Sequence, residues 1–120
     1  MSDLLTIQTQ LREFARERDW EQFHSPKNLS MAIASEAGEL LELFQWLSVP
    51  ESRHIMDDPK KAAGVCEEIA DVLIYLIRLA DILKIDLLQV TDQKIESNAR
   101  KYPISAAKGT ARKYNDLSGL

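Results

Sequence analysis

Apolar residues recur three or four positions apart through most of the 120-residue chain, and no stretch alternates convincingly with the two-residue period of a half-buried strand. This pattern predicts an all-α protein. Ser25-Pro26 and Asp58-Pro59 each have the sequence favoured at a helix start. The helices that we expect, in a fold like a four-helix bundle, span residues 3–18, 26–47, 59–83 and 86–102.

The domain organisation follows from the strength of this periodicity. We expect one domain over residues 1–103, because 45% hydrophobic residues in a chain of this length suffice for one modest core. Periodicity is weak over residues 104–120, which carry several basic side chains, so this part is expected to be a basic, extended tail. The net charge of −4 argues against a nucleic-acid polymer as the partner.

The apolar runs and the cysteine content indicate in which cellular compartment the protein is expected. No apolar run approaches the roughly 18 residues that a membrane span requires. The single cysteine, Cys66, cannot form an intramolecular disulfide, and the N-terminus lacks the pattern of a secretory signal. We therefore expect a cytoplasmic protein that does not enter a membrane.

The second predicted helix places glutamates where its buried face should lie. At 100° per residue its apolar stripe consists of Leu29, Ile33, Leu40, Leu43 and Leu47. Glu36 falls in the middle of this stripe, and Glu39 lies at one margin together with Trp46. Glu42 points further toward solvent. Buried carboxylates are costly, so Glu36 and Glu39 need an explanation.

The third predicted helix carries a second acidic pair. Glu68 and Asp71 share one margin of its apolar face with Tyr75. The centre of that face is formed by Val65, Ile69, Val72, Leu76, Leu79 and Leu83. Residues three apart lie on the same side of a helix, so two such helices packed together would gather both acidic pairs. Repulsion among these charges favours a divalent cation, and all-oxygen ligands favour Mg²⁺, with Mn²⁺ as a substitute.

The two acidic pairs read "EAGE" at residues 36–39 and "EIAD" at residues 68–71. With the segments "ERDWEQFHSPKNL", "FQWL", "DVLIYLIRLA" and "RKYP", they resemble the MazG-like family of all-α nucleoside triphosphate pyrophosphohydrolases, in particular its dCTP-hydrolysing branch. The resemblance implies Mg²⁺-dependent hydrolysis of a (deoxy)nucleoside triphosphate to the monophosphate and pyrophosphate, with dCTP or a modified dCTP preferred, in nucleotide-pool house-cleaning. It makes Glu36, Glu39, Glu68 and Asp71 the metal ligands. One of these carboxylates would activate the water, and we expect it to be Glu39.

The nucleotide itself is expected to contact two further groups of residues. Through the resemblance, Trp20, Trp46 and His24 match positions that face the base, and Tyr75 lies where it could brace the sugar. Polar residues on one face of the fourth predicted helix suit the phosphates, with a tyrosine alongside: Lys94, Asn98, Lys101 and Tyr102.

Ile74 and Ile77 extend the apolar face of the third predicted helix well round its circumference. A helix this apolar must be buried in something larger, so we expect a homo-oligomer, and the resemblance suggests a dimer or a dimer of dimers.

Two alternatives to this function remain open from the sequence. One is a non-catalytic helical interaction module, in which the acidic pairs are surface charges. The other is a di-iron carboxylate bundle, which needs Glu-x-x-His motifs that project inward. Such motifs occur at residues 21–24 and 51–54, but both fall in predicted connections.

Overall fold

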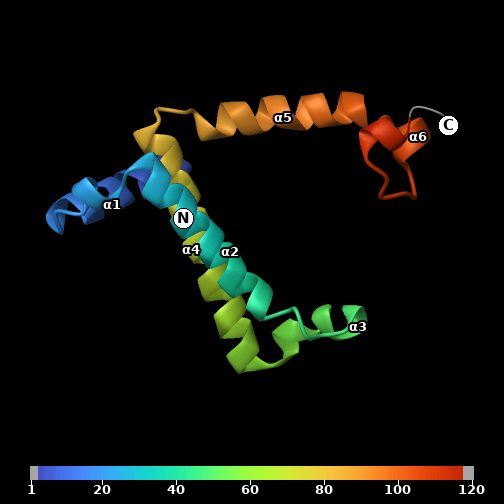
Figure 1. Ribbon diagram of the computed structural model, residues 1–120, viewed down its shortest axis with the longest axis horizontal. Helices are drawn as coiled ribbons and strands as arrows, with labels where there is room; N and C mark the ends of the chain where they lie inside the picture. Colours follow the sequence, from blue (N-terminus) through green and yellow to red (C-terminus); the bar gives the residue numbers. More distant parts are fainter. Residues whose placement is uncertain (1–2, 118–120) are drawn as a thin grey trace. The chain divides into compact units, whose positions relative to one another are not determined.

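The computed structural model describes residues 3–117, in which there are helices and no strands (Figure 1). The all-α prediction is therefore confirmed. The longer helices are α1 (Leu4–Glu17), α2 (Pro26–Glu42), α4 (Pro59–Ile82) and α5 (Leu87–Lys101). The shorter ones are α3 (Val49–Ser52), α6 (Ile104–Ala107) and the 3₁₀ helices η1 (Glu21–Phe23), η2 (Ile55–Asp57) and η3 (Tyr114–Asp116). None of the helices in the described range has the length and apolar character needed to cross a membrane.

The chain divides into two compact units at the Ile85–Asp86 bond. The first unit contains α1 to α4, and the second contains α5, α6 and η3. A four-helix bundle within one chain would require α5 to pack on the first unit, so this part of the fold remains a prediction. The division of the chain at residue 103 also remains a prediction.

In the first unit, α2 and α4 run antiparallel and side by side, and α1 packs against α4 (Figure 1). The buried residues of these three helices are Ala15, Leu29, Val65, Ile77, Arg78 and Ala80. The expected centre of the α4 face is only partly correct, because Ile69, Leu76 and Leu83 are 53%, 40% and 48% exposed. Since α4 is apolar almost all round, periodicity alone did not distinguish the side that packs within this unit from the side left open.

The helix starts agree with the predictions. Ser25 accepts a hydrogen bond from the backbone N–H of Asn28 (3.1 Å) and is followed by proline at the first position of α2. Asp58 caps α4 in the same way through the N–H of Lys60 (3.0 Å). Asp86 caps α5 through the N–H of Gln89. These caps satisfy N–H groups that have no partner within their own helix.

The predicted end of the second helix at residue 47 is wrong, because α2 ends at Glu42. The N–H of Leu43 bonds to the carbonyl of Leu40, which tightens the last turn. Five residues later, Ser48 and Glu51 form a reciprocal capping box that starts α3. The predicted connection thus contains two short helices, α3 and η2.

The predicted extended tail also differs from the structure. Within the second unit, residues 104–107 form α6 and residues 114–116 form η3. The rings of Tyr102 and Tyr114 meet edge to face with centroids 6.3 Å apart, and Leu117 is buried. The described tail residues are therefore not extended throughout.

Candidate active site

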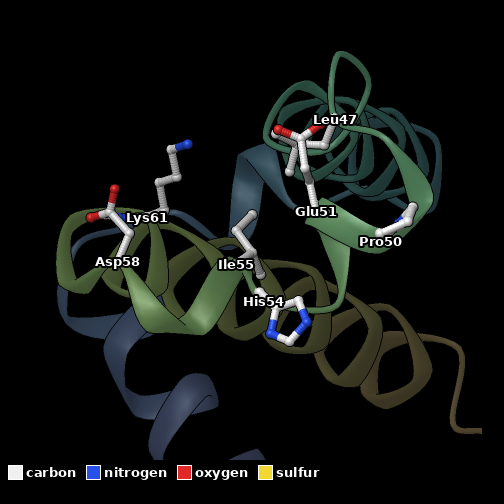
Figure 2. A pocket seen from close by; sticks show the side chains of 7 residues that line it. All are labelled: Leu47, Pro50, Glu51, His54, Ile55, Asp58 and Lys61. Carbon is white, nitrogen blue, oxygen red and sulfur yellow. Dashed lines mark hydrogen bonds between the residues drawn. The ribbon is translucent and has the colours of Figure 1, made fainter.

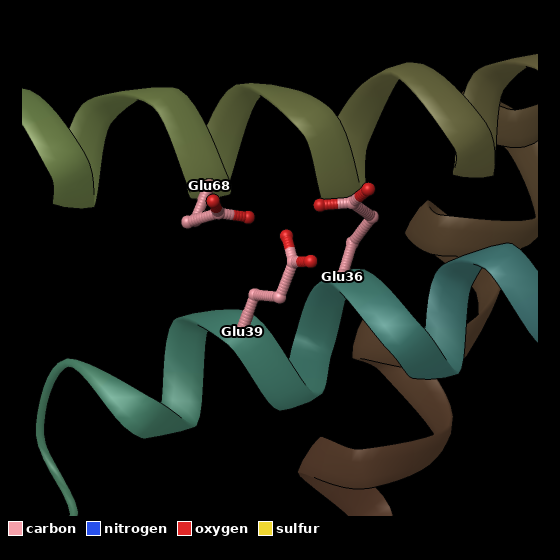
Figure 3. Close-up of side chains that lie close together, drawn as sticks. All are labelled: Glu36, Glu39 and Glu68. Carbon is pink, nitrogen blue, oxygen red and sulfur yellow. The ribbon is translucent and has the colours of Figure 1, made fainter.

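Three of the predicted metal ligands lie together at the interface between α2 and α4. Glu36 and Glu39 project from α2 toward Glu68 of α4, as Figure 3 shows. Each side chain offers an oxygen within 4.8 Å of those of the other two. Asp71 lies about one turn beyond Glu68 on α4 and is half-buried. We call Glu36, Glu39, Glu68 and Asp71 the acidic cluster.

The acidic cluster is electrostatically unsatisfied as it stands. Oε2 of Glu36 and Oε2 of Glu68 are both buried and have no hydrogen-bond partner. Among residues 3–117, no lysine or arginine forms an ion pair with any of the four carboxylates. Because buried carboxylate oxygens are costly without a partner, the arrangement calls for a positive charge between the two helices.

The pKa values show the same repulsion. The pKa of Glu36 is raised to about 7, first by the proton that it can share with Glu68, then by desolvation and by the nearby carboxylates of Glu39 and Asp71. Sharing that proton would lower the pKa of Glu68, but desolvation and the charges of Glu39 and Asp71 outweigh this effect, so that the pKa of Glu68 is raised as well.

The residues present could hold a divalent cation. Mg²⁺ binds oxygen ligands and is commonly held by a few carboxylates together with water and substrate phosphates. The acidic cluster offers only carboxylate oxygens, two of them buried and without a partner. Three of its members converge from two helices, and helices hold ligands more precisely than loops do.

A pocket of about 360 Å³ adjoins this cluster within the first unit. Its lining is mostly aromatic and apolar, and consists of Leu11, Phe14, Trp20, His24, Asp71, Ile74, Tyr75 and Arg78. The ring of Trp20 stands edge to face against Phe14 (centroids 5.7 Å apart) and His24 (6.4 Å). The structure thus brings Trp20, His24 and Tyr75 together with Asp71 in the lining of one pocket, as a small-molecule site would require. We call this the aromatic pocket.

Trp46 does not line this pocket, and its contact with the base remains a prediction. Trp46 is 88% exposed, since α2 ends four residues before it and the helical register that would place it beside Glu39 is lost. Four more of the predicted substrate residues belong to the second unit, so their contacts with phosphate remain predictions: Lys94, Asn98, Lys101 and Tyr102.

Arg78 is a pocket residue that the sequence analysis missed. It is only 6% exposed, and its Nε donates to Nδ1 of His24 (3.1 Å). Its Nη1 donates to Oδ2 of Asp81 (3.4 Å), and Asp81 also accepts two hydrogen bonds from Arg12 (3.0 and 2.7 Å). The sequence pattern that could have revealed it is an arginine three residues before an aspartate in the otherwise apolar run "VLIYLIRLADIL".

The Glu-x-x-His motifs do not supply the ligands of a di-iron site. Glu51 caps α3, and the exposed His54 faces Asp57, with 3.5 Å between Nδ1 and Oδ2. Both Glu51 and His54 line another pocket of about 390 Å³ (Figure 2). His24 of the first motif is engaged by Arg78. In the described part of the chain, no histidine belongs to the group of candidate metal ligands around Glu36.

The chain is similar to known proteins over most of its length. A family model described as MazG-like matches residues 31–117. The dCTP pyrophosphatase 1 proteins of Mus musculus and Homo sapiens are 50% and 47% identical over 105 residues, which cover 88% of this chain. The chain spans only 62% of the length of those relatives. A crystal structure of a pyrophosphatase from Archaeoglobus fulgidus is 46% identical, with a TM-score of 0.72, and the match covers 78% of this chain and 85% of that one.

Proposed function

Because the chain belongs to the MazG-like family, we propose that it is a Mg²⁺-dependent enzyme that hydrolyses a nucleoside triphosphate to the monophosphate and pyrophosphate. The mammalian relatives are named for dCTP, and the archaeal structure is named a pyrophosphatase. We therefore propose dCTP or a modified dCTP as the preferred substrate, and the removal of such nucleotides from the pool as the role.

One observation carries this proposal: the acidic cluster and the aromatic pocket meet at Asp71. The charge of Asp71 contributes to the raised pKa values of Glu36 and Glu68, and its side chain also lines the pocket beside Trp20. A nucleotide with its base in the pocket would therefore have its phosphates near carboxylates that lack a counter-charge. A metal–triphosphate complex supplies both the base and the missing positive charge.

The members of the acidic cluster would hold the ion. When bound, Mg²⁺ polarises the phosphoryl oxygens, offsets the charge that develops on pyrophosphate and lowers the pKa of bound water. Glu39 is exposed, unlike half-buried Glu36 and Glu68, and we assign it the proton of the attacking water. Water attacks the α-phosphorus, and the bond from that phosphorus to the bridging oxygen breaks. The monophosphate and pyrophosphate are the products.

The aromatic pocket would hold the base and the sugar. Stacking on an aromatic ring such as Trp20 is worth about 1–3 kcal/mol per base in comparable sites and suits any base. The preference for one base must therefore come from hydrogen bonds to its edge, and we assign these to His24, whose ring meets that of Trp20 edge to face. Tyr75 would lie against the sugar.

We also propose that a second copy of the chain covers the open side of α4. Ile69, Leu73 and Leu76 are 53%, 47% and 40% exposed, and their spacing places them on one side of the helix. A contiguous apolar surface of this kind is typical of an interface. Analytical ultracentrifugation tests this directly, because Leu76→Glu is expected to shift an oligomer toward the monomer.

The activity is tested by measuring pyrophosphate and monophosphate released from canonical and modified NTPs and dNTPs, with Mg²⁺ and with EDTA. We expect Mg²⁺-dependent release that favours dCTP and is lost in Asp71→Ala. The matched control is Glu42→Ala, because Glu42 is an exposed carboxylate of α2 outside the cluster. Turnover of no nucleotide would overturn the proposal in favour of a helical interaction module, and wild-type release by Asp71→Ala would overturn the assigned site.

A further inference from the structure

A chain of polar side chains runs from Arg12 through Asp81 and Arg78 to His24, and its last two members line the aromatic pocket. Arg78 bridges His24 and Asp81, and the side chains of Arg78 and Asp81 are only 7% and 12% exposed. Arg12 holds Asp81 from the other side through two hydrogen bonds. A buried guanidinium is costly unless it is paired, and here Asp81 supplies the opposite charge.

The hydrogen bond from Arg78 determines which nitrogen of His24 carries the proton. An arginine side chain stays charged and can only donate, so Nδ1 of His24 must be the acceptor and carry no hydrogen. A neutral imidazole then has its hydrogen on Nε2, which is the only ring nitrogen left for a ligand. Burial and the charge of Arg78 both lower the pKa of His24, so the neutral form prevails at pH 7.

Other charged side chains lie near His24, but in the described residues none of them hydrogen-bonds to Nδ1 apart from Arg78. The ring of Trp20 packs against the His24 imidazole on the pocket side. His24 also lines an adjoining cavity of about 480 Å³, together with Arg12, Glu21, Arg78, Asp81, Ile82 and Lys84. Within residues 3–117, the only hydrogen bond to the imidazole is the one from Arg78.

We propose that Arg78 and Asp81 are positioning residues that hold His24 as an Nε2–H donor at the edge of the base. The inference rests on the proposed nucleotide site and adds a basis for its selectivity. Cytosine N3 accepts a hydrogen bond, whereas N3 of thymine or uracil carries a hydrogen and donates. A fixed donor therefore pairs with N3 of cytosine and opposes N3 of thymine, while the other tautomer would do the reverse.

The first test is the imidazole ¹⁵N spectrum of the metal-free, nucleotide-free protein at pH 7. The chain has two histidines, so a His54→Gln variant leaves His24 alone in the spectrum. We expect an unprotonated Nδ1 and a protonated Nε2. A mixture of tautomers like that of free histidine, or a hydrogen on Nδ1, would overturn the proposal. This readout requires neither turnover nor a variant at Arg78.

The second test asks whether the tautomer selects the base. Calorimetry with dCMP and dTMP in EDTA measures base recognition without hydrolysis. We expect wild type to favour dCMP, and Arg78→Met to reduce that preference about tenfold, as the loss of one oriented hydrogen bond allows. Arg78→Lys keeps a donor and is expected to restore part of the preference. Arg16→Met removes an exposed arginine of α1 that pairs with Glu13, and serves as the control.

The outcomes separate this proposal from the proposed activity. An unchanged dCMP preference in a folded Arg78→Met variant, or equal affinity of wild type for both nucleotides, would refute the positioning role. Absence of pyrophosphate release, with the tautomer and the dCMP preference intact, would refute the activity and leave the positioning role standing.

Discussion

Replacing Glu36 with glutamine is expected to stabilise the metal-free protein at pH 8. The pKa of Glu36 is raised from 4.5 to about 7, first by the proton that it can share with Glu68 and then by desolvation. A carboxyl group with a raised pKa resists ionisation in the folded state. Its contribution to stability is therefore fully present below pH 4.5, declines as the pH rises to about 7, and is lost above that. Glutamine stays neutral throughout.

The size of the effect follows from the pKa difference. One pKa unit corresponds to about 1.4 kcal/mol, so the rise of the Glu36 pKa from 4.5 to about 7 sets an upper limit of roughly 3.5 kcal/mol at pH 8. Glu36 is only half-buried and shares its proton with Glu68, so solvent screening reduces this figure. We expect Glu36→Gln to raise the free energy of unfolding by about 1–2 kcal/mol at pH 8.

Urea unfolding in EDTA at fixed protein concentration, at pH 5 and pH 8, measures this effect. Glu42→Gln removes the same charge from an exposed position on α2 and is the matched control. We expect the free energy of unfolding of Glu36→Gln to exceed that of wild type clearly at pH 8 and by less at pH 5. We also expect Mg²⁺ to stabilise wild type more than Glu36→Gln. The reasoning is refuted if Glu36→Gln stabilises the protein no more than Glu42→Gln does at pH 8. It is also refuted if Glu36→Gln raises the free energy of unfolding equally at both pH values.

Three further substitutions test the core, a helix cap and the pocket. Ile77→Ala leaves a cavity at a side chain that is 2% exposed and is expected to lower the free energy of unfolding by about 2–5 kcal/mol; an unchanged urea midpoint would contradict this packing. Asp58→Ala removes the cap of α4 and is expected to destabilise by about 1 kcal/mol, whereas Asp57→Ala is not. Trp20→Ala is expected to raise KM for dCTP about tenfold, with exposed Phe23→Ala as the control, and equal KM values would argue against stacking.

The helix starts were predictable because their determinants are local. Ser25, Asp58 and Asp86 each bond to an N–H two or three residues further on, so the sequence contains the whole interaction. The end of α2 was not predicted, because no glycine or proline follows Glu42 directly and the apolar spacing continues to Leu47. The early end of α2 also explains why Trp46 does not lie beside Glu39 on that helix, where the periodicity had predicted it.

The acidic cluster was predictable because residues three apart share a helix face and both helices carry an acidic pair. The contact between Arg78 and His24 joins residues 54 positions apart and depends on how η1 approaches α4, which the local sequence pattern does not specify. Tertiary packing likewise determines which apolar side of α4 is covered, so that Ile77 is buried while Leu76 is 40% exposed.

The central claim is that the acidic cluster binds Mg²⁺, and calorimetric titration of the nucleotide-free protein with Mg²⁺ tests it most directly. The comparison is between wild type, Glu68→Gln and Glu67→Gln, because Glu67 is the exposed neighbour of a half-buried cluster member. We predict that wild type and Glu67→Gln bind Mg²⁺ alike, and that Glu68→Gln binds at least about tenfold more weakly. Equal affinity of Glu68→Gln and Glu67→Gln would contradict the account.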